Sequence, residues 1–382
     1  MKLDDIRKEI DEIDQAMTEL FRRRMECSRK VAEYKRERGM QIFNAGREQE
    51  ILDRAEKDGG EYGAAARLLF ASVMELSRDL QHNMLDTGEE LRNEMLSSAK
   101  ELPQDHSDLK IACFGVPGTY THQACEDIFS GSEPVFYPSF REVFTAVQDG
   151  EAEFGIVPVE NSSAGSVTEV YDLLIQYRFC IIAEADIPVN HCLAGVKGAD
   201  ISGIHKVYSH AQALAQCSDF IRSRHLEQEG FLSTAAAARM VSERGDTSIA
   251  AICSEQAAGF YGLDILSRGF QNQPDNTTRF IAVSKKMIIT DDADKISLCF
   301  SLPHKTGSLY AMLRRFASKG LNLTKLESRP KAGEPFEYMF YLDFIGNIRD
   351  KSTIDLLCAL SEELPDFSFL GSYLSQHRTK TD

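Results

Sequence analysis

The first 38 residues of the chain contain neither glycine nor proline, the two residues that most readily interrupt a helix. The absence of both residues allows one long helix over this segment. Apolar side chains recur in it every three or four positions, at Leu3, Ile6, Ile10, Ile13, Met17 and Leu20. The pattern predicts an amphipathic helix that ends at Gly39. Further helices are predicted over residues 47–57 and 64–85, separated by Gly59-Gly60. The N-terminal segment is therefore expected to be all-α.

Two cations of the first predicted helix, Arg24 and Lys35, are eleven residues apart and so lie on nearly the same helical face. Along the helix axis they are about 16 Å apart, which two long side chains can span toward a ligand between them. On the third helix Ser77 and Gln81 share a face, because they are four residues apart. For most other charged residues of these helices, a solvated surface is the simpler interpretation.

The middle of the chain alternates between short apolar runs and helical patterns, which predicts parallel sheets covered by helices. The alternation falls into two successive sets, so we expect two α/β lobes around a hinge, an arrangement like that of the type II periplasmic binding proteins. Ligands of such sheets bind at the carboxyl ends of the strands. The predicted strands cover residues 110–114, 135–137, 154–159, 180–187, 206–208, 231–232 and 248–252, and the helices cover 124–129, 140–149, 167–177, a stretch ending at about 224, 234–244 and 254–261.

Three polar clusters lie at ends of predicted elements in this region. The first is Asn276-Thr277-Thr278-Arg279-Phe280, where a strand would place Thr278 and Phe280 on one face and Arg279 on the other. The second lies within residues 158–167 and contains Glu160, Asn161 and Ser162, and the third lies within residues 209–217 and contains Ser209, Gln212 and Gln216. Taken singly, each cluster is also compatible with an ordinary strand end; their combination favours a binding cleft.

The last ninety residues have the predicted order strand, helix, strand, strand, helix, strand, over residues 295–302, 307–319, 321–329, 336–346, 352–364 and 367–373. This order is typical of an α+β ferredoxin-like fold, which serves many functions. Two short motifs lie within it, Lys305-Thr306-Gly307-Ser308-Leu309-Tyr310 and Glu327-Ser328-Arg329-Pro330. The polar stretch from 87 to 108, by contrast, is expected to be a linker.

Composition excludes several classes of protein. The net charge of −16 argues against a nucleic-acid partner, because phosphate binding needs a basic surface. The nine cysteines include no C-x-x-C pair and no histidine at zinc-ligand spacing, so we expect no metal and a reducing compartment. No run approaches membrane-spanning length, and the first residues are acidic where a signal peptide would be apolar. We therefore expect a cytoplasmic protein without a membrane partner.

The segment from Lys2 to about Met84 resembles the all-helical (AroQ-type) chorismate mutase family. The resemblance implies that Lys35 and Gln81 act at the ether oxygen of chorismate, that arginines bind its carboxylates and that Glu48 binds its hydroxyl. The implied site residues are Arg7, Arg24, Lys35, Arg47, Glu48, Ser77 and Gln81. Arg7 and Arg24 are seventeen residues apart, about 25 Å on a straight helix, so one small ligand cannot reach both on the same helix. A mutase site that uses both therefore implies an intertwined homodimer.

The three polar clusters together resemble the prephenate dehydratase family. The resemblance implies that Thr278 is the catalytic residue, acting as hydrogen-bond donor or proton conduit to the departing hydroxyl. It also implies a cleft lined by Glu160, Asn161, Ser162, Ser209, Gln212, Gln216, Arg279 and Phe280. For Glu160 two roles stay open: it is a candidate acid, or it orients the loop that carries Asn161.

The two C-terminal motifs resemble those of the ACT domains attached to prephenate dehydratases, which bind phenylalanine at a domain interface. The implied effector residues are Gly307, Ser308, Leu309, Glu327, Ser328 and Arg329, although Ser308 and Tyr310 depart from the smaller apolar residues usual there. Feedback would require phenylalanine to bind the less active state more tightly.

We therefore predict a helical mutase domain (1–86), a linker (87–108), a dehydratase domain of two α/β lobes (109–286) and an ACT domain (294–376). The expected activity is conversion of chorismate through prephenate to phenylpyruvate without a cofactor, in a homodimer or dimer of dimers, under feedback by L-phenylalanine. Two alternatives remain: a two-lobed ligand-binding regulator without catalysis, and a dehydratase whose helical part only dimerises. The sequence shows no helix-turn-helix and no basic face, which disfavours the regulator.

Overall fold

The N-terminal part of the molecule is a bundle of three helices, α1 (Leu3–Arg38), α2 (Ala45–Asp58) and α3 (Gly63–Leu85), with a short 3₁₀ turn η1 (Gly60–Tyr62) between the last two. The computed structural model describes residues 2–273, 275–331, 334 and 337–376. As predicted, α1 ends at Gly39, which adopts the left-handed conformation of a helix C-cap. Both α1 and α2 pack against α3.

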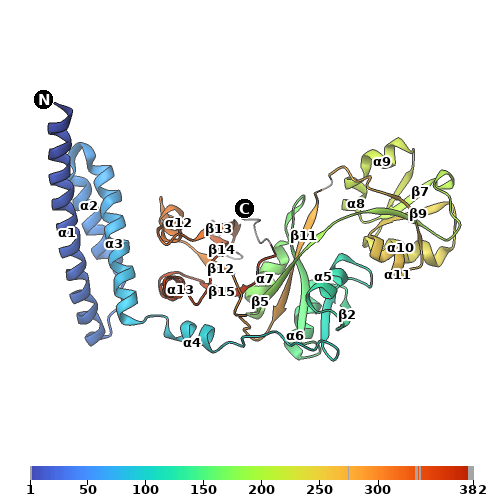
Figure 1. Cartoon of the computed structure of the whole chain (residues 1–382), viewed down its shortest axis with the longest axis horizontal. Coiled ribbons are helices and arrows are strands. Elements are labelled where there is room, and N and C mark those ends of the chain that lie inside the picture. Colours follow the sequence, from blue (N-terminus) through green and yellow to red (C-terminus); the bar gives the residue numbers. More distant parts are fainter. Residues whose placement is uncertain (1, 274, 332–333, 335–336, 377–382) are drawn as a thin grey trace.

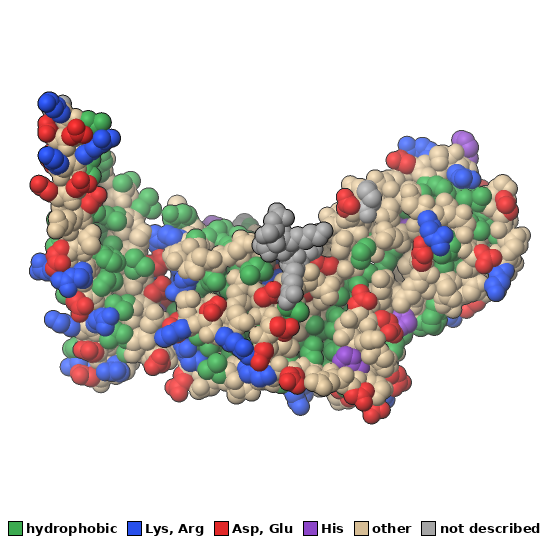
Figure 2. Space-filling model, in the orientation of Figure 1, with side chains coloured by type: hydrophobic (Ala, Val, Ile, Leu, Met, Phe, Trp, Pro, Cys, Tyr) green, Lys and Arg blue, Asp and Glu red, His purple; other side chains and the backbone are tan. Residues whose placement is uncertain are grey.

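The apolar stripe of α1 is not covered by the rest of the chain. Ile10, Ile13 and Leu20 are 50%, 52% and 59% exposed, and on α3 Leu68 is 61% exposed. In Figure 1 this bundle stands at one end of the molecule, with α1 on its outer edge. Apolar side chains accordingly show at the surface of the bundle in Figure 2. The predicted amphipathic pattern is confirmed, but its apolar side has no partner within one described chain.

The first lobe is built on a sheet in the order β2-β1-β3-β11-β5, with the short β4 added to β3. Helix α5 packs on one face, while α6, α7 and part of the C-terminal region pack on the other. Its elements are β1 (Lys110–Phe114), α5 (Tyr120–Ile128), β2 (Glu133–Tyr137), α6 (Phe140–Asp149), β3 (Phe154–Asn161), β4 (Gly165–Ser166), α7 (Thr168–Tyr177), β5 (Cys180–Pro188) and β11 (Thr277–Ser284).

The second lobe has a sheet in the order β10-β6-β9-β7-β8. Its elements are β6 (Cys192–Gly195), η2 (Ile201–Gly203), β7 (Lys206–Ser209), α8 (Ala211–Gln216), α9 (Ser218–Ser223), β8 (Glu227–Gly230), α10 (Thr234–Arg244), β9 (Ile249–Cys253), α11 (Glu255–Phe260) and β10 (Asp264–Arg268). The chain crosses from one lobe to the other after β5 and returns before β11 (Figure 1).

Several details of the lobes differ from the sequence-based expectation. The sheets are mixed, because β11 returns antiparallel to both β3 and β5, and β6 is antiparallel to β9 and β10. The strand predicted at 231–232 lies instead at Glu227–Gly230, which is polar because it is an exposed edge strand. The helix predicted to end near 224 is divided at Cys217 into α8 and α9.

The C-terminal part has the predicted strand and helix order, namely β12 (Lys295–Ser301), α12 (Ser308–Ser318), β13 (Asn322–Pro330), β14 (Tyr338–Ile345), α13 (Lys351–Glu363) and β15 (Ser368–Tyr373). The strands form an antiparallel sheet in the order β13-β14-β12-β15, the ferredoxin-like arrangement. Phe336, the predicted start of β14, lies outside the described residues. The segment expected to be a plain linker contains α4 (Glu89–Ser97), whose Met95 is fully buried in the core of this C-terminal part.

The C-terminal part lies between the helical bundle and the first lobe (Figure 1). It contacts the bundle through α13 and α3, and it contacts the first lobe through β15 and β5. The space-filling view shows a broad hollow along one side of the molecule, with the tip of α1 and the second lobe at its two ends (Figure 2). Among the described residues, no helix is both long enough and apolar enough to span a bilayer.

Candidate active sites

The helical bundle encloses a small pocket of about 100 Å³, and the structure brings six of the seven residues predicted for the mutase into it. They come from all three helices: Arg24, Lys35, Arg47, Glu48, Ser77 and Gln81. The side chain of Asn44 helps to shape this site, because it caps α2 by accepting a hydrogen bond from the backbone N–H of Arg47 at 3.0 Å. Arg7 does not line the pocket; it is exposed near the N-terminus of α1 and pairs with Asp4.

The polar atoms of this pocket are held by short-range contacts. Arg24 donates to Ser28 and Ser77 at 2.8 and 3.1 Å, which fixes the guanidinium at the junction of α1 and α3. Lys35 donates to the backbone oxygen of Ile42. Burial lowers the pKa of the Lys35 ammonium, and the nearby carboxylate of Glu48 opposes this shift.

Gln81 leaves one polar atom free in the mutase pocket. Its Nε2 donates to the backbone oxygen of Ser77 at 3.1 Å, whereas its Oε1 is buried and has no hydrogen-bond partner within the described chain. A buried acceptor without a donor is costly unless a ligand supplies one. The arrangement therefore suits a small molecule that carries both anionic and hydroxyl groups.

Arg78 is a pocket residue that the sequence reasoning missed. Its Nη1 lies 2.5 Å from each carboxylate oxygen of Glu48, and its Nε lies 3.5 Å from Glu363 of α13. The side chain thus connects the mutase pocket to the C-terminal part. No local pattern could have indicated this, because the two carboxylates are 30 residues upstream and 285 residues downstream in the sequence.

The second polar centre lies at the start of β11, where the chain returns from the second lobe to the first. Asn161 donates from Nδ2 to Thr278 Oγ1 at 2.8 Å. The orientation of this amide is determined on its other side, where Oδ1 accepts the backbone N–H groups of Ser163 and Ala164 at 3.1 and 3.0 Å. Because Thr278 Oγ1 accepts from an N–H group, its own proton is free to be donated elsewhere.

A chain of hydrogen bonds extends from this centre across the two lobes. Ser163 Oγ donates to Asn161 Oδ1 at 2.7 Å, and it accepts from Nε2 of Gln216, on α8 of the second lobe, at 3.0 Å. Gln216 Oε1 lies 3.1 Å from His191 Nε2, and His191 Nδ1 lies 3.2 Å from the hydroxyl of Tyr120. Of the predicted cleft residues, Asn161, Gln216 and Thr278 therefore belong to one network.

His191 was not predicted, although it is the residue of this network nearest to the hinge between β5 and β6. It is buried, and burial lowers the pKa of its imidazole, opposed by the hydrogen bond with Gln216. A neutral ring can donate from Nε2 to Oε1 of Gln216. A single histidine between two strands carries no spacing signal, so sequence reasoning had no means of selecting it.

Three predicted cleft residues do not share the position of Thr278. Arg279 and Glu160 are direct partners on β11 and β3, one residue away from the Thr278–Asn161 pair, so they point to the opposite face of the sheet. Phe280 is on the Thr278 side but is 3% exposed and belongs to the core of the first lobe. The expectation that these side chains lie with Thr278 is therefore corrected, and the two roles left open for Glu160 both stay predictions.

The other three residues predicted for the cleft are Ser162, Ser209 and Gln212, and each lies in a different environment. Ser162 holds the start of β11, because its Oγ accepts the backbone N–H of Thr277 at 3.0 Å. Ser209 is fully buried and donates to the backbone oxygen of Ile252 at 2.5 Å, so its hydroxyl supports β7 and β9 rather than facing solvent. Gln212 is exposed on the first turn of α8.

Arg279 lies among carboxylates on the face of the sheet turned toward the C-terminal part. It is 3.1 Å from Asp186 and 3.5 Å from both Glu160 and Glu184. Burial alone would lower the pKa of Arg279, but the surrounding carboxylates raise it, so this cation stays charged at any pH at which the protein folds.

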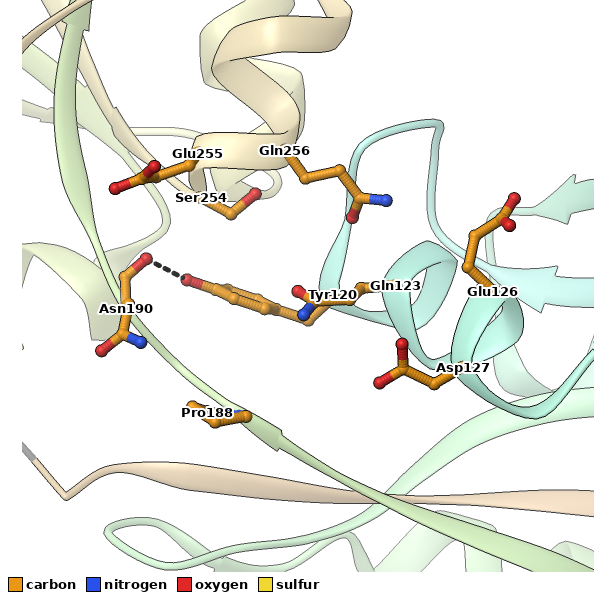
Figure 3. A pocket seen from close by; sticks show the side chains of 9 residues that line it. All are labelled: Tyr120, Gln123, Glu126, Asp127, Pro188, Asn190, Ser254, Glu255 and Gln256. Atoms are coloured by element: carbon orange, nitrogen blue, oxygen red, sulfur yellow. Dashed lines mark hydrogen bonds between the residues drawn. The ribbon is translucent and has the colours of Figure 1, made fainter. Parts of the chain in front are cut away.

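A separate hollow of about 470 Å³ lies beside the hinge, where α5 of the first lobe approaches α11 of the second (Figure 3). Tyr120 extends across it, and its hydroxyl donates to the backbone oxygen of Asn190 at 2.9 Å. Three carboxylates line it, those of Glu126, Asp127 and Glu255. Their negative potential disfavours a dianionic ligand, so the Thr278 centre is the better candidate for the dehydratase site.

The predicted effector residues fall into two groups. Ser308 and Leu309 line a hollow of about 380 Å³ beside the start of α12, whose N-cap is Gly307. Glu327 and Arg329 instead point from β13 to the first lobe, where they contact Ser166 and Asp172. Ser328 is exposed on the other side of β13. The structure of one chain therefore does not bring the two motifs together.

Comparison with known proteins agrees with this division of the chain. Residues 6–82 match the family model of chorismate mutase type II, and residues 111–288 match that of prephenate dehydratase. The chain is 31% identical to a bifunctional chorismate mutase/prephenate dehydratase of Pseudomonas aeruginosa, over 96% of each chain. It is also 31% identical to a protein of the same description from Aquifex aeolicus, over 97% of this chain and 98% of the relative.

A solved structure is similar to a large part of the chain. It is the prephenate dehydratase of Arthrobacter aurescens in complex with L-Phe, which is 32% identical and has a TM-score of 0.64, covering 70% of this chain and 90% of that one.

Proposed function

The chain belongs to the family of bifunctional chorismate mutase/prephenate dehydratases, and we propose that its two reactions take place at separate sites, the pocket of the helical bundle and the interlobe cleft at Thr278. The enzyme rearranges chorismate to prephenate, and then decarboxylates and dehydrates prephenate to phenylpyruvate. The observation that carries the assignment of the sites is that each polar centre leaves one group available to a ligand: Gln81 Oε1 in the pocket and the Thr278 hydroxyl proton in the cleft.

At the mutase site the reaction needs no proton transfer and no covalent step. The pocket has to hold chorismate in its compact conformer and stabilise the negative charge that grows on the ether oxygen as its C–O bond breaks. Lys35 and Gln81 are the proposed donors to that oxygen, with Arg24 and Arg47 binding carboxylates. To donate to the ligand, Gln81 would have to release its Nε2 from the backbone oxygen of Ser77. Glu48 would accept the ring hydroxyl, held in place by Arg78.

At the dehydratase site the ring carboxylate leaves as carbon dioxide, and its bonding electrons move into the ring while the C4 hydroxyl departs. The departing oxygen needs a hydrogen bond or a proton, and aromatisation provides the driving force. The proposed donor is Thr278, because Asn161 occupies its acceptor side and directs its proton outward. Gln216 closes the cleft from the second lobe through Ser163.

We place the phenylalanine effector in the C-terminal part, which we assign as an ACT domain. Its ferredoxin-like sheet, the hollow beside Ser308 and Leu309, and the relative solved with L-Phe support this proposal. Because Glu327 and Arg329 point away from that hollow in one chain, a complete effector site would need a second chain or a rearranged strand β13. The domain boundaries given above and the cytoplasmic location stay predictions.

The proposed assembly is a homodimer through α1. The uncovered apolar stripe of α1 and the distance of Arg7 from the mutase pocket both support it. In such a dimer Arg7 of one chain would complete the pocket of the other. A dimer of dimers stays open.

The assignment of the two sites is tested with chorismate as the only substrate, by following prephenate and phenylpyruvate with and without phenylalanine. Lys35→Ala is expected to lower chorismate turnover by about 10²- to 10³-fold while prephenate turnover persists. Thr278→Val is expected to do the reverse, so that prephenate accumulates. Thr278→Ser, which keeps the hydroxyl, is the matched control and should retain most activity. Full dehydratase activity in Thr278→Val would refute the assignment of Thr278.

A further inference from the structure

Strand β13 presents a polar strip to the first lobe. Along this strand half-buried residues alternate with exposed ones, and Lys325, Glu327 and Arg329 all fall on the half-buried side. Arg329 donates to the backbone oxygen of Thr168 at 2.7 Å and pairs with Asp172 of α7 at 3.2 Å. The strip therefore docks the C-terminal part on the elements that follow β3.

Lys325 reaches furthest toward the dehydratase centre. Its Nζ lies 3.1 Å from Glu160 Oε2 and 3.0 Å from Ser166 Oγ, and its side chain is 8% exposed. The ring of Tyr171 lies under the ammonium at 5.0 Å. A lysine buried to this degree with a carboxylate partner is a specific contact between domains, because a surface pair of this kind would be solvated.

Glu160 connects this contact to strand β11. On the same face of the sheet Glu160 is the direct partner of Arg279, and its carboxylate lies 3.5 Å from the guanidinium. The next pair in the register is Asn161 and Thr278, which lies on the opposite face. Adjacent residues of a strand alternate in direction, so one pair of strand ends carries the dehydratase centre on one side and the Lys325 contact on the other.

The charges around Glu160 indicate what replacing Lys325 with an uncharged residue would do. The carboxylates of Glu184 and Asp186 also face Arg279, and Lys295 pairs with Glu184 at 2.7 Å. Without Lys325, Glu160 would depend on Arg279 alone, and Arg279 would be drawn from Asp186 toward Glu160. That displacement would act on the backbone of β11 one residue from Thr278.

We propose that Lys325 of the C-terminal domain is a positioning residue for the dehydratase reaction, because it neutralises Glu160 and so holds the β3–β11 pair in the register that aligns Asn161 with Thr278. The inference rests on the proposed assignment of Thr278 to the dehydratase site. It makes dehydration dependent on the docking of β13, the strand that also carries Glu327 and Arg329. The mutase pocket shares no residue with the network, so its activity does not depend on Lys325.

The test compares full-length Lys325→Met with Lys325→Arg and with the matched control Lys331→Met. Lys331 is a lysine of the same domain that pairs with Asp366 and Glu334 and lies outside the network. We expect Lys325→Met to lower the dehydratase kcat about tenfold with little change in KM, since Lys325 does not reach the cleft. Lys325→Arg should restore most of kcat, Lys331→Met should match the unaltered enzyme, and all three should keep full mutase activity, which shows that they are folded.

A double mutant decides whether Lys325 acts through Glu160. If it does, Glu160→Gln combined with Lys325→Met is no slower than the slower of the two single variants; multiplied effects would overturn the proposal. An unchanged kcat in Lys325→Met beside an inactive Thr278→Val would also overturn it, while leaving the site assignment intact. Activity retained in Thr278→Val would instead remove the site assignment on which the proposal rests.

Discussion

At Thr278 the decisive feature is the direction of one hydrogen bond. Asn161 could in principle offer either its oxygen or its nitrogen, but its oxygen is already engaged by two backbone N–H groups. The threonine oxygen is thereby made an acceptor toward Asn161, and its proton stays available for donation. A residue type that is common in strands becomes a donor with a defined direction because of its neighbours.

Lys35 provides a prediction at the same scale. Burial lowers its pKa, so the ammonium loses its proton at a lower pH than an ordinary lysine, whose pKa is 10.5. Because the charged form is the one that would stabilise the ether oxygen, mutase kcat/KM should fall on the alkaline side through this lowered pKa. The pH–rate profile measures it. In Lys35→Arg any remaining activity should lose this alkaline limb; a limb that stays in place would show that another group titrates.

At the scale of elements, Gly371 marks where strand β15 meets the first lobe. It has a φ of 149°, and a Cβ added there would lie 2.1 Å from the backbone oxygen of Ile181 on β5. A backbone atom cannot move away as a side chain can, so β15 and β5 approach this closely only because residue 371 is glycine.

Gly371→Ala is therefore expected to separate the C-terminal domain from the first lobe. We expect a large loss of dehydratase activity and faster proteolysis between the two parts, with mutase activity preserved. Gly320→Ala is the matched control, because that glycine also has a positive φ but has open space around it. Equal effects of the two substitutions would show that backbone strain, and not the contact with Ile181, is responsible.

The contact between α3 and α13 depends on Glu363. Burial alone would raise the pKa of this carboxyl, but the hydrogen bond from His82 and the charges of Arg315 and Arg78 lower it to about 2. A lowered pKa in the folded state stabilises the fold at pH values above the ordinary value of 4.5, and this contribution is lost as the pH falls toward 2.

Glu363→Gln should therefore lower the apparent Tm at neutral pH, and the difference from the unaltered protein should shrink as the pH falls from 4.5 toward 2. Differential scanning calorimetry across this range measures it. Glu362→Gln, next to it on α13, is a suitable control. A difference in Tm that is constant with pH would mean that the carboxylate of Glu363 is not the stabilising group.

At the scale of the whole molecule, the C-terminal domain touches both catalytic parts. Arg78 and Glu363 connect it to the mutase pocket, and Lys325 and Glu160 connect it to the dehydratase lobe. The two proposed sites therefore have one neighbour in common, although one lies in the helical bundle and the other at the start of β11 (Figure 1).

The proposed dimer leads to a prediction about a mutase pocket shared between two chains. If Arg7 of one chain completes the pocket containing Lys35 of the other, then Arg7→Ala and Lys35→Ala should each strongly lower mutase activity as homodimers. In a mixture refolded together, half of the dimers are mixed and each has one intact pocket, so about a quarter of normal activity should return. Mutase assays of the mixture measure this recovery. Absence of recovery, with dimers shown by analytical ultracentrifugation, would mean that Arg7 does not act across the interface.

Much of the architecture could be predicted from local sequence. Apolar periodicity and the helix-breaking residues glycine and proline act over a few residues, so they can be read directly from the sequence. They predicted the long helix up to Gly39, the helix at 140–149 and the C-terminal order of strands and helices. Two of the polar clusters meet at the ends of β3 and β11, where Asn161 bonds to Thr278, and their role in catalysis stays a prediction. The resemblance to the chorismate mutase and prephenate dehydratase families then indicated which two reactions to expect.

Only the tertiary structure decided which of these polar residues meet. Lys325 and Glu160 are 165 residues apart, and Ser163 and Gln216 meet across the lobes. Alternation along a strand already placed Arg279 opposite Thr278, but only the pairing of β3 with β11 put Glu160 beside Arg279 and Asn161 beside Thr278. The periodicity of apolar residues indicates which side of a helix or strand is buried. The partner of a charged side chain depends instead on how elements that are distant in the sequence pack together.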